Sequence, residues 1–342
     1  MAFKNAKLVN LALQGGGSHG AFTWGVLDRL LDDERIEFEA ISAVSSGAMN
    51  ACVMASGFIN GGREGAKDSI AAFWQAVAAK YHDLFESNPA TMWNKAVGFD
   101  YPISLESYFS FTEKFSPYEL NPFNLNPLKD ILDNLVDFEQ LRKASPFKLH
   151  IGATQVRTGK MRVFTNEDLN ADVLLASACL PSLHHAIEID GEHYWDGAFS
   201  GNPPLFPLIF NSTHPDILVV LLQPLLRESV PTTVDEIRKR TYELSFSNTF
   251  LREMRAIALS KEEIKQEWLS SGSLEKRMHK LNIHMIEDES FEQMDASSRL
   301  YAGSDLIQDL YIRGEETAHN WLKQHYAAIT KRSSVDLLKL FA

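Results

Sequence analysis

The chain opens with the same hydrophobic pattern used twice. A β-like apolar run over residues 7–13 leads through a glycine loop into residues 21–31, where apolar positions recur at helical spacing. A second β-like run over residues 36–44 is followed by a helix over residues 46–55, and Gly57 is expected to end that helix. Two strand–helix units in succession predict an α/β sheet with parallel strands.

Shorter apolar runs with turn signals continue through the second half of the chain. Residues 147–154 and 160–165 are predicted strands joined by a turn at residues 157–159. Residues 186–195 form a predicted hairpin that turns at Asp190-Gly191. Further strands are expected at residues 216–222 and 282–286, with long helices at residues 234–268 and 305–324.

The region from residue 80 to about residue 141 has a different composition. It is rich in Asn, Pro and aromatic residues, and no regular hydrophobic period is visible in it. We interpret it as a long irregular insertion that packs its rings on the domain. The alternative is a cap that offers these rings to a hydrophobic substrate, since long loops in compact domains are often functional. The rings are those of Phe99, Tyr101, Tyr108, Phe109, Phe111, Phe115, Tyr118 and Phe123.

Composition narrows the range of partners. The 342 residues are 45% hydrophobic, enough for one substantial core, and no part has a disordered composition. The net charge of -12 leaves no general basic surface for phosphates, so nucleic acid is not an expected partner. It also disfavours tight electrostatic docking on anionic membranes, while apolar insertion stays open. No calcium-loop pattern or ligand cluster is visible, so no metal or other cofactor is expected.

Cysteine content and hydropathy favour a cytoplasmic location. Only Cys52 and Cys179 are present, and two cysteines do not make a disulfide framework. The N-terminal residues carry too short an apolar stretch for a signal peptide, and no stretch reaches membrane-spanning length. We therefore expect a soluble protein made in the cytosol, with signal-less export or peripheral membrane contact as alternatives.

A candidate nucleophile stands between the second predicted strand and its helix. The segment Ala43-Val44-Ser45-Ser46-Gly47 has the pattern of a nucleophile elbow, with small residues two before and two after Ser45. In such an elbow the serine hydroxyl projects from a tight turn, and the following backbone N–H lies at a helix N-terminus, ready to stabilise an oxyanion. Ala43 stands where the usual pattern has glycine.

The loop after the first strand offers backbone donors beside that serine. Gly15, Gly16 and Gly17 have no side chains that would block a substrate, and neighbouring parallel strands end at the same edge of a sheet. The same loop also fits the dinucleotide fingerprint Gly15-x-Gly17-x-x-Gly20. That alternative lacks the acidic residue expected at the end of the second strand. A purely structural tight turn is a third interpretation.

A serine nucleophile needs a base, and the sequence offers two kinds. Five downstream histidines are candidates, His214, His279, His284, His319 and His325, and none of them follows a strand in a loop that would aim it at Ser45. His19, inside the glycine loop, is expected to contact the loop or solvent. Asp196 follows a hydrophobic strand and opens a run of small residues, whereas Asp190-Gly191 is explained by its hairpin turn. The sequence favours Asp196, and a histidine-assisted hydrolase stays open.

Taken together, these motifs resemble the patatin-like phospholipases. The glycine loop from Gly15 to Gly20, the elbow at Ser45 and the triplet Asp196-Gly197-Ala198 occur in the family's order. The resemblance covers about residues 7–225. It implies a three-layer α/β/α sandwich with a mainly parallel central sheet, and lipid acyl hydrolase activity. It further implies a Ser45–Asp196 dyad without histidine, and an oxyanion hole made by the amides of Gly15, Gly16 and Gly17, with that of Ser46 assisting.

The predicted organisation is one acyl hydrolase domain over residues 1–342. It has a core at about 7–225, the cap-like insertion at about 80–141 and a C-terminal helical region at about 226–342. The expected substrate is a lipid or other acyl ester, with phospholipase A or lysophospholipase activity first. Alternatives are an esterase or depolymerase for neutral lipid or polyester, and a non-catalytic lipid-binding module. Head group, oligomeric state and any transient contact with a lipid surface do not follow from the sequence.

Overall fold

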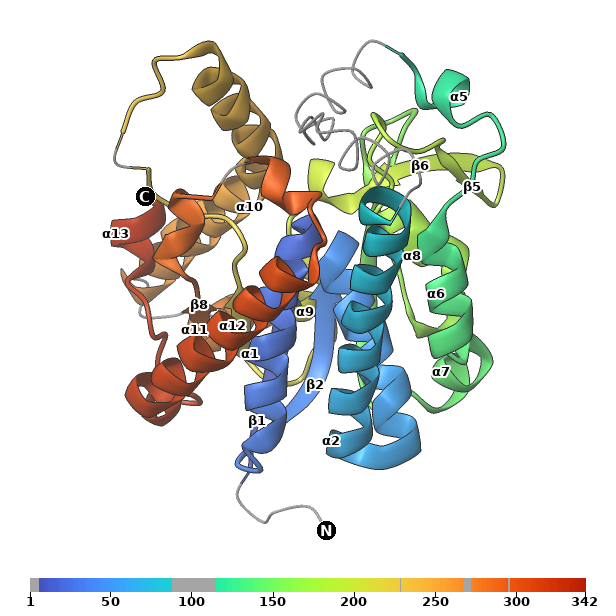
Figure 1. Cartoon of the computed structure of the whole chain (residues 1–342). Coiled ribbons are helices and arrows are strands. Elements are labelled where there is room, and N and C mark those ends of the chain that lie inside the picture. Colours follow the sequence, from blue (N-terminus) through green and yellow to red (C-terminus); the bar gives the residue numbers. More distant parts are fainter. Residues whose placement is uncertain (1–5, 88–114, 228, 267–271, 295) are drawn as a thin grey trace.

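One central sheet organises the computed structural model of the chain, which describes residues 6–87, 115–227, 229–266, 272–294 and 296–342. Its eight strands run in the order β5-β6-β3-β2-β1-β7-β8, with β4 paired to the other edge of β3 (Figure 1). The strands are β1 Lys7–Leu13, β2 Ile36–Ala43, β3 Lys148–Gln155, β4 Met161–Phe164, β5 Ile187–Ile189, β6 Glu192–Asp196, β7 Asp216–Val220 and β8 Asn282–Ile286.

The helices connect and cover these strands. The α-helices are α1 Gly20–Asp32, α2 Ser45–Tyr81, α5 Pro117–Leu120, α6 Pro127–Leu135, α7 Phe138–Ala144, α8 Ala171–Ser177, α9 Phe206–Asn211, α10 Val234–Gln266, α11 Ser273–Lys280, α12 Ser304–His325 and α13 Leu337–Phe341. Short turns of helix are η1 Gly17–His19, η2 His82–Glu86, η3 Asn166–Asp168, η4 Gly197–Phe199, η5 Glu289–Glu292, η6 Ala296–Arg299 and η7 Tyr326–Ala328.

The middle of the sheet is parallel, as the repeated strand–helix pattern predicts. β1 pairs in parallel with β2 and β7, β2 with β3, and β7 with β8. β4, β5 and β6 are antiparallel additions at one side. Strand β7 is buried along its whole length, which is typical of a parallel strand covered on both faces.

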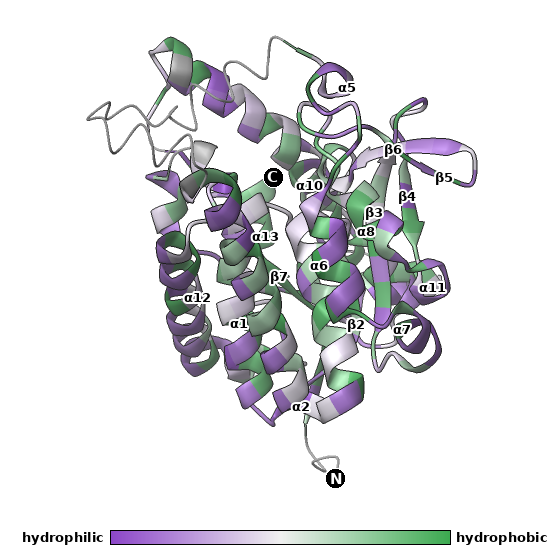
Figure 2. Cartoon of the chain, turned by 45° about the vertical axis from the view of Figure 1, so that its right-hand side comes forward, coloured by the Kyte–Doolittle hydropathy of each residue, from purple (hydrophilic) through white to green (hydrophobic). Residues whose placement is uncertain are grey.

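Helices cover both faces of the sheet, so the predicted three-layer α/β/α sandwich is confirmed (Figure 1). On one face, α1, α2 and α12 form a hydrophobic core with the side chains of Leu11 and Leu13 from β1. On the other, α9, α10 and α13 pack against Ile217 and Val219 from β7. Helix α12 buries residues at helical spacing, and its remaining surface is largely hydrophilic (Figure 2).

The prediction that Gly57 ends its helix is wrong. Helix α2 continues past it, and the helical geometry breaks only at Gly61 and Gly62, where the chain folds back on itself. Gly57 serves close packing instead, because a Cβ added there would lie 2.2 Å from the carbonyl oxygen of Gly65. The lone glycine was therefore wrongly interpreted as a helix stop, whereas its role is a close contact between two helix segments.

The insertion from residue 80 to about 141 is less irregular than predicted. Its end contains α6 and α7, each begun by a side-chain cap, from Asn126 and Asp137. Leu132 and Leu141 are fully buried and fix the two helices to the core. Their shortness hid the period, since nine or fewer residues show few apolar repeats. Of the rings expected to pack on the domain, or alternatively to line a cap, those of Phe99, Tyr101, Tyr108, Phe109 and Phe111 lie outside the described residues.

Within the described ranges, none of the helices has the length and apolar character needed to cross a bilayer. Both cysteines, Cys52 and Cys179, are buried and unpaired.

We predict that Gly57→Ala destabilises the protein, although alanine is ordinarily the better helix former. The added methyl group would overlap the Gly65 carbonyl, and overpacking of this kind costs about 1–3 kcal/mol. Gly61→Ala is the matched control, because its φ of -143° suits alanine and nothing lies within 4 Å of its added Cβ. Urea unfolding measures both. Equal free energies of unfolding for the two variants would contradict the packing role of Gly57.

Candidate active site

The register of β3 brings two distant segments together. One edge of β3 pairs with β4 over Ile151 to Thr154. The opposite edge pairs first with β2, up to Ala43 opposite Ile151, and then with β6, where Asp196 lies opposite Ala153. β6 therefore takes over the edge at the point where β2 ends. As a result, Asp196, the last residue of β6, and Ser45, two residues after the end of β2, come together beside the carboxyl ends of the parallel strands.

Ser45 occupies the tight turn between β2 and α2. Its φ of 52° lies in the left-handed region, which is strained for a residue with a side chain and common at functional turns. Two contacts hold it there. Its backbone N–H donates to Ser177 Oγ at 2.9 Å, and that hydroxyl donates to the Gly152 carbonyl at 2.7 Å. The turn also needs Gly47, because a Cβ there would lie 2.5 Å from the Leu13 carbonyl oxygen.

Asp196 is the acidic group at this turn. It is only 2% exposed, and its Oδ1 accepts a hydrogen bond from the Ala198 N–H at 2.8 Å. Desolvation raises its pKa to about 7, while hydrogen bonds from the Ala198 backbone and the Ser45 side chain act in the opposite direction. The structure thus places the Ser45 side chain close enough to Asp196 to lower the pKa of that carboxyl against the effect of desolvation.

The glycine loop lies directly against the elbow. An added Cβ on Gly15 would come within 2.7 Å of Ser45 Cβ, so only glycine allows this approach. The loop's own amides are partly in use. Gly15 N–H donates to Asn202 Oδ1 at 2.7 Å, and Gly16 N–H donates to Ser46 Oγ at 3.0 Å. No described residue accepts a hydrogen bond from the amides of Gly17 or Ser46.

An apolar wall borders the serine turn. Val44 and Ala198 are buried together with Phe246, which comes from the N-terminal half of α10. Met161, Leu180 and Phe199 pack against them and complete this cluster, which we call the apolar wall. The rings of Phe199 and Phe246 lie 4.7 Å apart between centroids. The wall's partly buried members, Met161, Leu180 and Phe199, present apolar side chains beside the serine turn.

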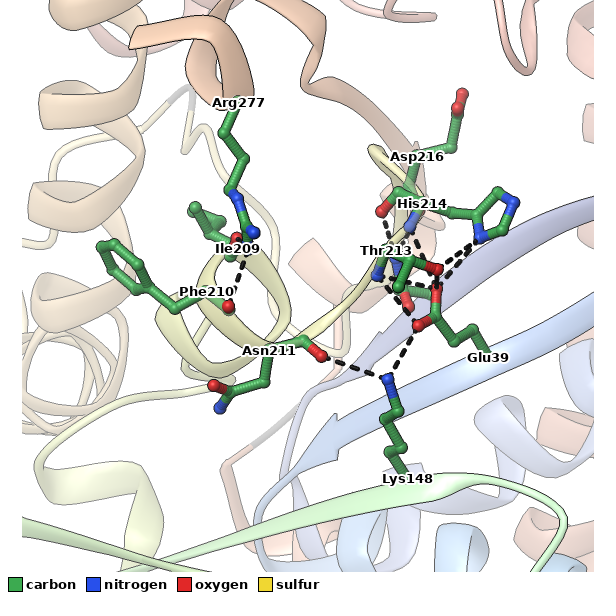
Figure 3. Close-up of polar contacts among 10 residues, drawn as sticks. Glu39, Lys148, Ile209, Phe210, Asn211, Thr213, His214, Asp216 and Arg277 are labelled. Carbon is green, nitrogen blue, oxygen red and sulfur yellow. Dashed lines mark hydrogen bonds and ion pairs between the residues drawn. The ribbon is translucent and has the colours of Figure 1, made fainter. Parts of the chain in front are cut away.

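The histidines that the sequence left open as bases are engaged elsewhere. His214 contacts Glu39 at 3.1 Å, beside Lys148 and Thr213, at the amino ends of β3 and β7 (Figure 3). Desolvation alone would raise the pKa of Glu39, but hydrogen bonds from Thr213, Lys148 and His214 outweigh it and lower that pKa to about 2. His214 and Glu39 therefore belong to a polar network near the amino ends of β3 and β7, whereas Ser45 lies at the carboxyl end of β2.

His284 and His19 are both buried. His284 Nε2 lies 3.0 Å from Asp216 Oδ1, again near the amino end of β7. His19 lies near the glycine loop, with Nε2 2.7 Å from Ser298 Oγ and its ring 5.0 Å from that of Phe291. Desolvation, with a smaller effect of Arg299, lowers the pKa of His19 to about 3.

Two supporting residues were missed by the sequence analysis. Ser177 positions the Ser45 amide, and it carries no signal because it ends an ordinary short helix, α8. Asn202 brackets Gly15, accepting from its N–H and donating from Nδ2 to its carbonyl at 3.2 Å. A faint signal for Asn202 existed, since it lies in the run of small residues after Asp196. The described residues contain no group of three or more side chains suited to hold a metal ion.

Comparison with known proteins gives first the class and then the family. A serine turn between a parallel strand and a helix, beside a loop of backbone donors, is the arrangement of acyl hydrolases. The family model of the patatin-like phospholipases matches residues 11–209, more than half of the 342 residues. The chain therefore belongs to the patatin-like phospholipase family, whose members are lipid acyl hydrolases. Membership supports a hydrolase with a lipid substrate.

Other comparisons add little. Among solved structures, VipD from Legionella pneumophila is similar over 95% of this chain and 68% of its own, at 16% sequence identity and a TM-score of 0.43. Curated proteins gave no significant sequence match.

The raised pKa of Asp196 predicts a pH-dependent cost in stability. Above pH 4 the unfolded chain releases this proton, while the folded protein keeps it up to about pH 7. Stability from this group is thus present at low pH and lost as the pH rises through 7. We expect the stability of Asp196→Asn relative to wild type to increase by roughly 2–4 kcal/mol from pH 5 to pH 8. Urea unfolding at both pH values measures it.

Asp190→Asn is the matched control for that measurement, because it makes the same change in an exposed hairpin turn. Its stability difference from wild type should be the same at both pH values. A difference for Asp196→Asn that does not change with pH would contradict the raised pKa.

Proposed function

We propose that this protein hydrolyses carboxylic ester bonds of lipids with a Ser45–Asp196 dyad, in the manner of a phospholipase A or lysophospholipase. One observation carries the proposal: Ser45 lies on a strained turn beside the buried carboxyl of Asp196, whose pKa is raised to about 7 by desolvation and lowered in part by the Ser45 side chain. A carboxylate of ordinary pKa is a weak base for a serine hydroxyl. A pKa near 7 improves the driving force for proton transfer and keeps much of the group ionised at neutral pH.

The proposed reaction has two halves. Ser45 Oγ attacks the ester carbonyl carbon as Asp196 takes the hydroxyl proton, which gives a tetrahedral oxyanion. The oxyanion collapses, the bond to the alcohol oxygen breaks, and Asp196 returns the proton to that oxygen. Water then attacks the acyl-serine as Asp196 accepts one of its protons. Release of the fatty acid gives that proton back to Ser45.

The oxyanion would be stabilised by backbone amides around the turn. Of the predicted donors, Gly17 and Ser46 have amides that no described residue occupies, so we assign them the main role. The amides of Gly15 and Gly16 hold the loop through Asn202 and the Ser46 hydroxyl. Amides fixed in this way are worth more than water donors, because they need no reorganisation when charge develops.

The apolar wall supports an acyl chain as the substrate's reacting part. Phe199 and Phe246 place aromatic surface beside Ala198, two residues after the proposed base. Burying hydrocarbon against such a surface contributes about 25 cal/mol per Å². An ester of a long acyl chain is therefore favoured over a small polar ester, which the wall would not bind.

Removing either member of the dyad should abolish hydrolysis. We expect Ser45→Ala and Asp196→Asn each to lower kcat by about 10³- to 10⁴-fold on p-nitrophenyl butyrate and on phospholipid. Asp190→Asn should retain wild-type rates, since the other Asp-Gly pair of the chain lies in a hairpin turn, where Asp190 pairs with Arg162. Circular dichroism checks that the variants are folded. Full activity in either dyad variant would rule out the proposed mechanism.

The pH profile tests the base separately. Because Asp196 must be ionised to accept the Ser45 proton, kcat/KM should rise about tenfold per pH unit below 7 and level off above it. A histidine-assisted mechanism through His214 or His284 predicts loss of activity in His214→Gln or His284→Gln. The dyad mechanism predicts that neither histidine variant loses a catalytic base. A flat profile between pH 5 and 8 would argue against Asp196.

A further inference from the structure

Three arginines surround one carboxylate near the glycine loop. Arg227 donates to Glu243 from Nε at 3.2 Å and also from Nη2. Arg240 Nη1 and Arg299 Nη2 lie 3.4 Å and 3.9 Å from the same carboxylate. In the described ranges, every ion pair of these arginines ends on Glu243. Three guanidinium groups thus share the carboxylate of Glu243, in a chain whose net charge is -12.

Arg299 is the least satisfied member of this arginine cluster. Its side chain is 11% exposed, and its Nε has no hydrogen-bond partner among the described residues. Desolvation lowers its pKa, which shows that the charge is held at some cost. A buried guanidinium with an unused donor costs free energy unless an acceptor reaches it. An anion with several oxygens is the acceptor that fits a guanidinium best.

The cluster borders the proposed catalytic turn from two directions. The backbone carbonyl of Arg299 lies against the glycine loop, where a Cβ added to Gly17 would come within 2.1 Å of it. From the other direction, Tyr242 precedes Glu243 on α10. Its pKa is raised to about 12 by desolvation and by the charge of Asp196, and the charge of Arg299 acts oppositely. Tyr242 thus stands within reach of both charges.

Helix α10 continues from the cluster to the apolar wall. Phe246, three residues after Glu243, packs against Ala198 beside the proposed base. The ring of Tyr242 lies 4.6 Å from that of Phe246 and bridges the two regions. One stretch of α10 therefore carries a cationic group at one end and a hydrocarbon surface at the other.

We propose that Arg240 and Arg299 bind the phosphate of a glycerophospholipid head group while its acyl chain lies on the apolar wall. The assignment rests on the proposed hydrolase function and deepens it by naming two residues outside the family match that would hold the phosphate and so select among lipids. In a glycerophospholipid only a few bonds separate the phosphate from the nearest ester, which matches a cationic group next to the catalytic turn. Arg227 keeps its two-pronged pair with Glu243 and holds the cluster together. A neutral lipid or polyester would offer these arginines no anionic partner besides Glu243.

The kinetic test compares two lipids with the same acyl chains, a phosphatidylglycerol and a diacylglycerol, in mixed detergent micelles. We expect Arg299→Met and Arg240→Met each to lower the ratio of kcat/KM for phospholipid over diacylglycerol by about tenfold, mainly through KM. Arg240→Lys should recover part of the ratio. Arg252→Met, the same change at an exposed position of α10, should leave it unaltered. Arg240 is 29% exposed, so its variant keeps the test valid if Arg299→Met does not fold.

A binding test separates this proposal from the hydrolase mechanism. Calorimetry with the Ser45→Ala protein measures binding of dihexanoyl phosphatidylcholine, dihexanoylglycerol and inorganic phosphate. Tighter binding of the phospholipid, weakened about tenfold by Arg240→Met, supports the head-group site even if wild type hydrolyses neither lipid. An unchanged ratio in folded Arg240→Met overturns the head-group site while the hydrolase function stands. Inorganic phosphate that binds at the cluster without competing with the phospholipid would also overturn it.

Discussion

The pairing along one edge of strand β3 sets the geometry on which the candidate site depends. β2 and β6 follow each other along a single edge, so the end of a parallel strand and the end of an antiparallel one become neighbours. Ser45 and Asp196 meet for this reason, and neither local sequence contains the information. A slip of one residue in the β3–β6 register would turn Asp196 to the other face of the sheet. Thr154 Oγ1, which donates to the Asp196 carbonyl at 2.8 Å, helps to fix that register.

The site stores free energy that the surrounding core must offset. A left-handed serine costs on the order of 1–3 kcal/mol, and desolvation of Asp196 adds a cost that grows with pH. Both costs are tied to the chemistry that the site is proposed to perform. The strained turn places Ser45 just after the end of β2, and desolvation makes Asp196 a stronger base. The buried carboxyl-terminal part of β1, which neighbours β2, and the fully buried strand β7 beyond it provide the compensating packing.

Local signals in the sequence predicted most of the fold, whereas contacts between residues far apart in the chain were not predictable from the sequence. The bounds of β1, β8 and the Asp190-Gly191 hairpin follow from short apolar runs and turn residues, and the structure matches them. Gly57 was misjudged because its role depends on a helix segment that returns after a bend. The positions of the serine turn and Asp196 were predictable from motifs, whereas Ser177 and Asn202 act through contacts that only the folded chain creates.

The family match ends at residue 209, yet groups beyond it border the site. Phe246 on α10 completes the apolar wall, and Arg299 in η6 lies on the glycine loop. These later elements reach the serine turn because β7 and β8 extend the sheet beyond β1, which returns the chain to the same edge. The reaction chemistry can therefore reside in the matched region while the surfaces that would select the substrate come from the C-terminal part. We therefore expect exchange of the C-terminal part to alter which lipid is hydrolysed and to leave the pH dependence of hydrolysis in place.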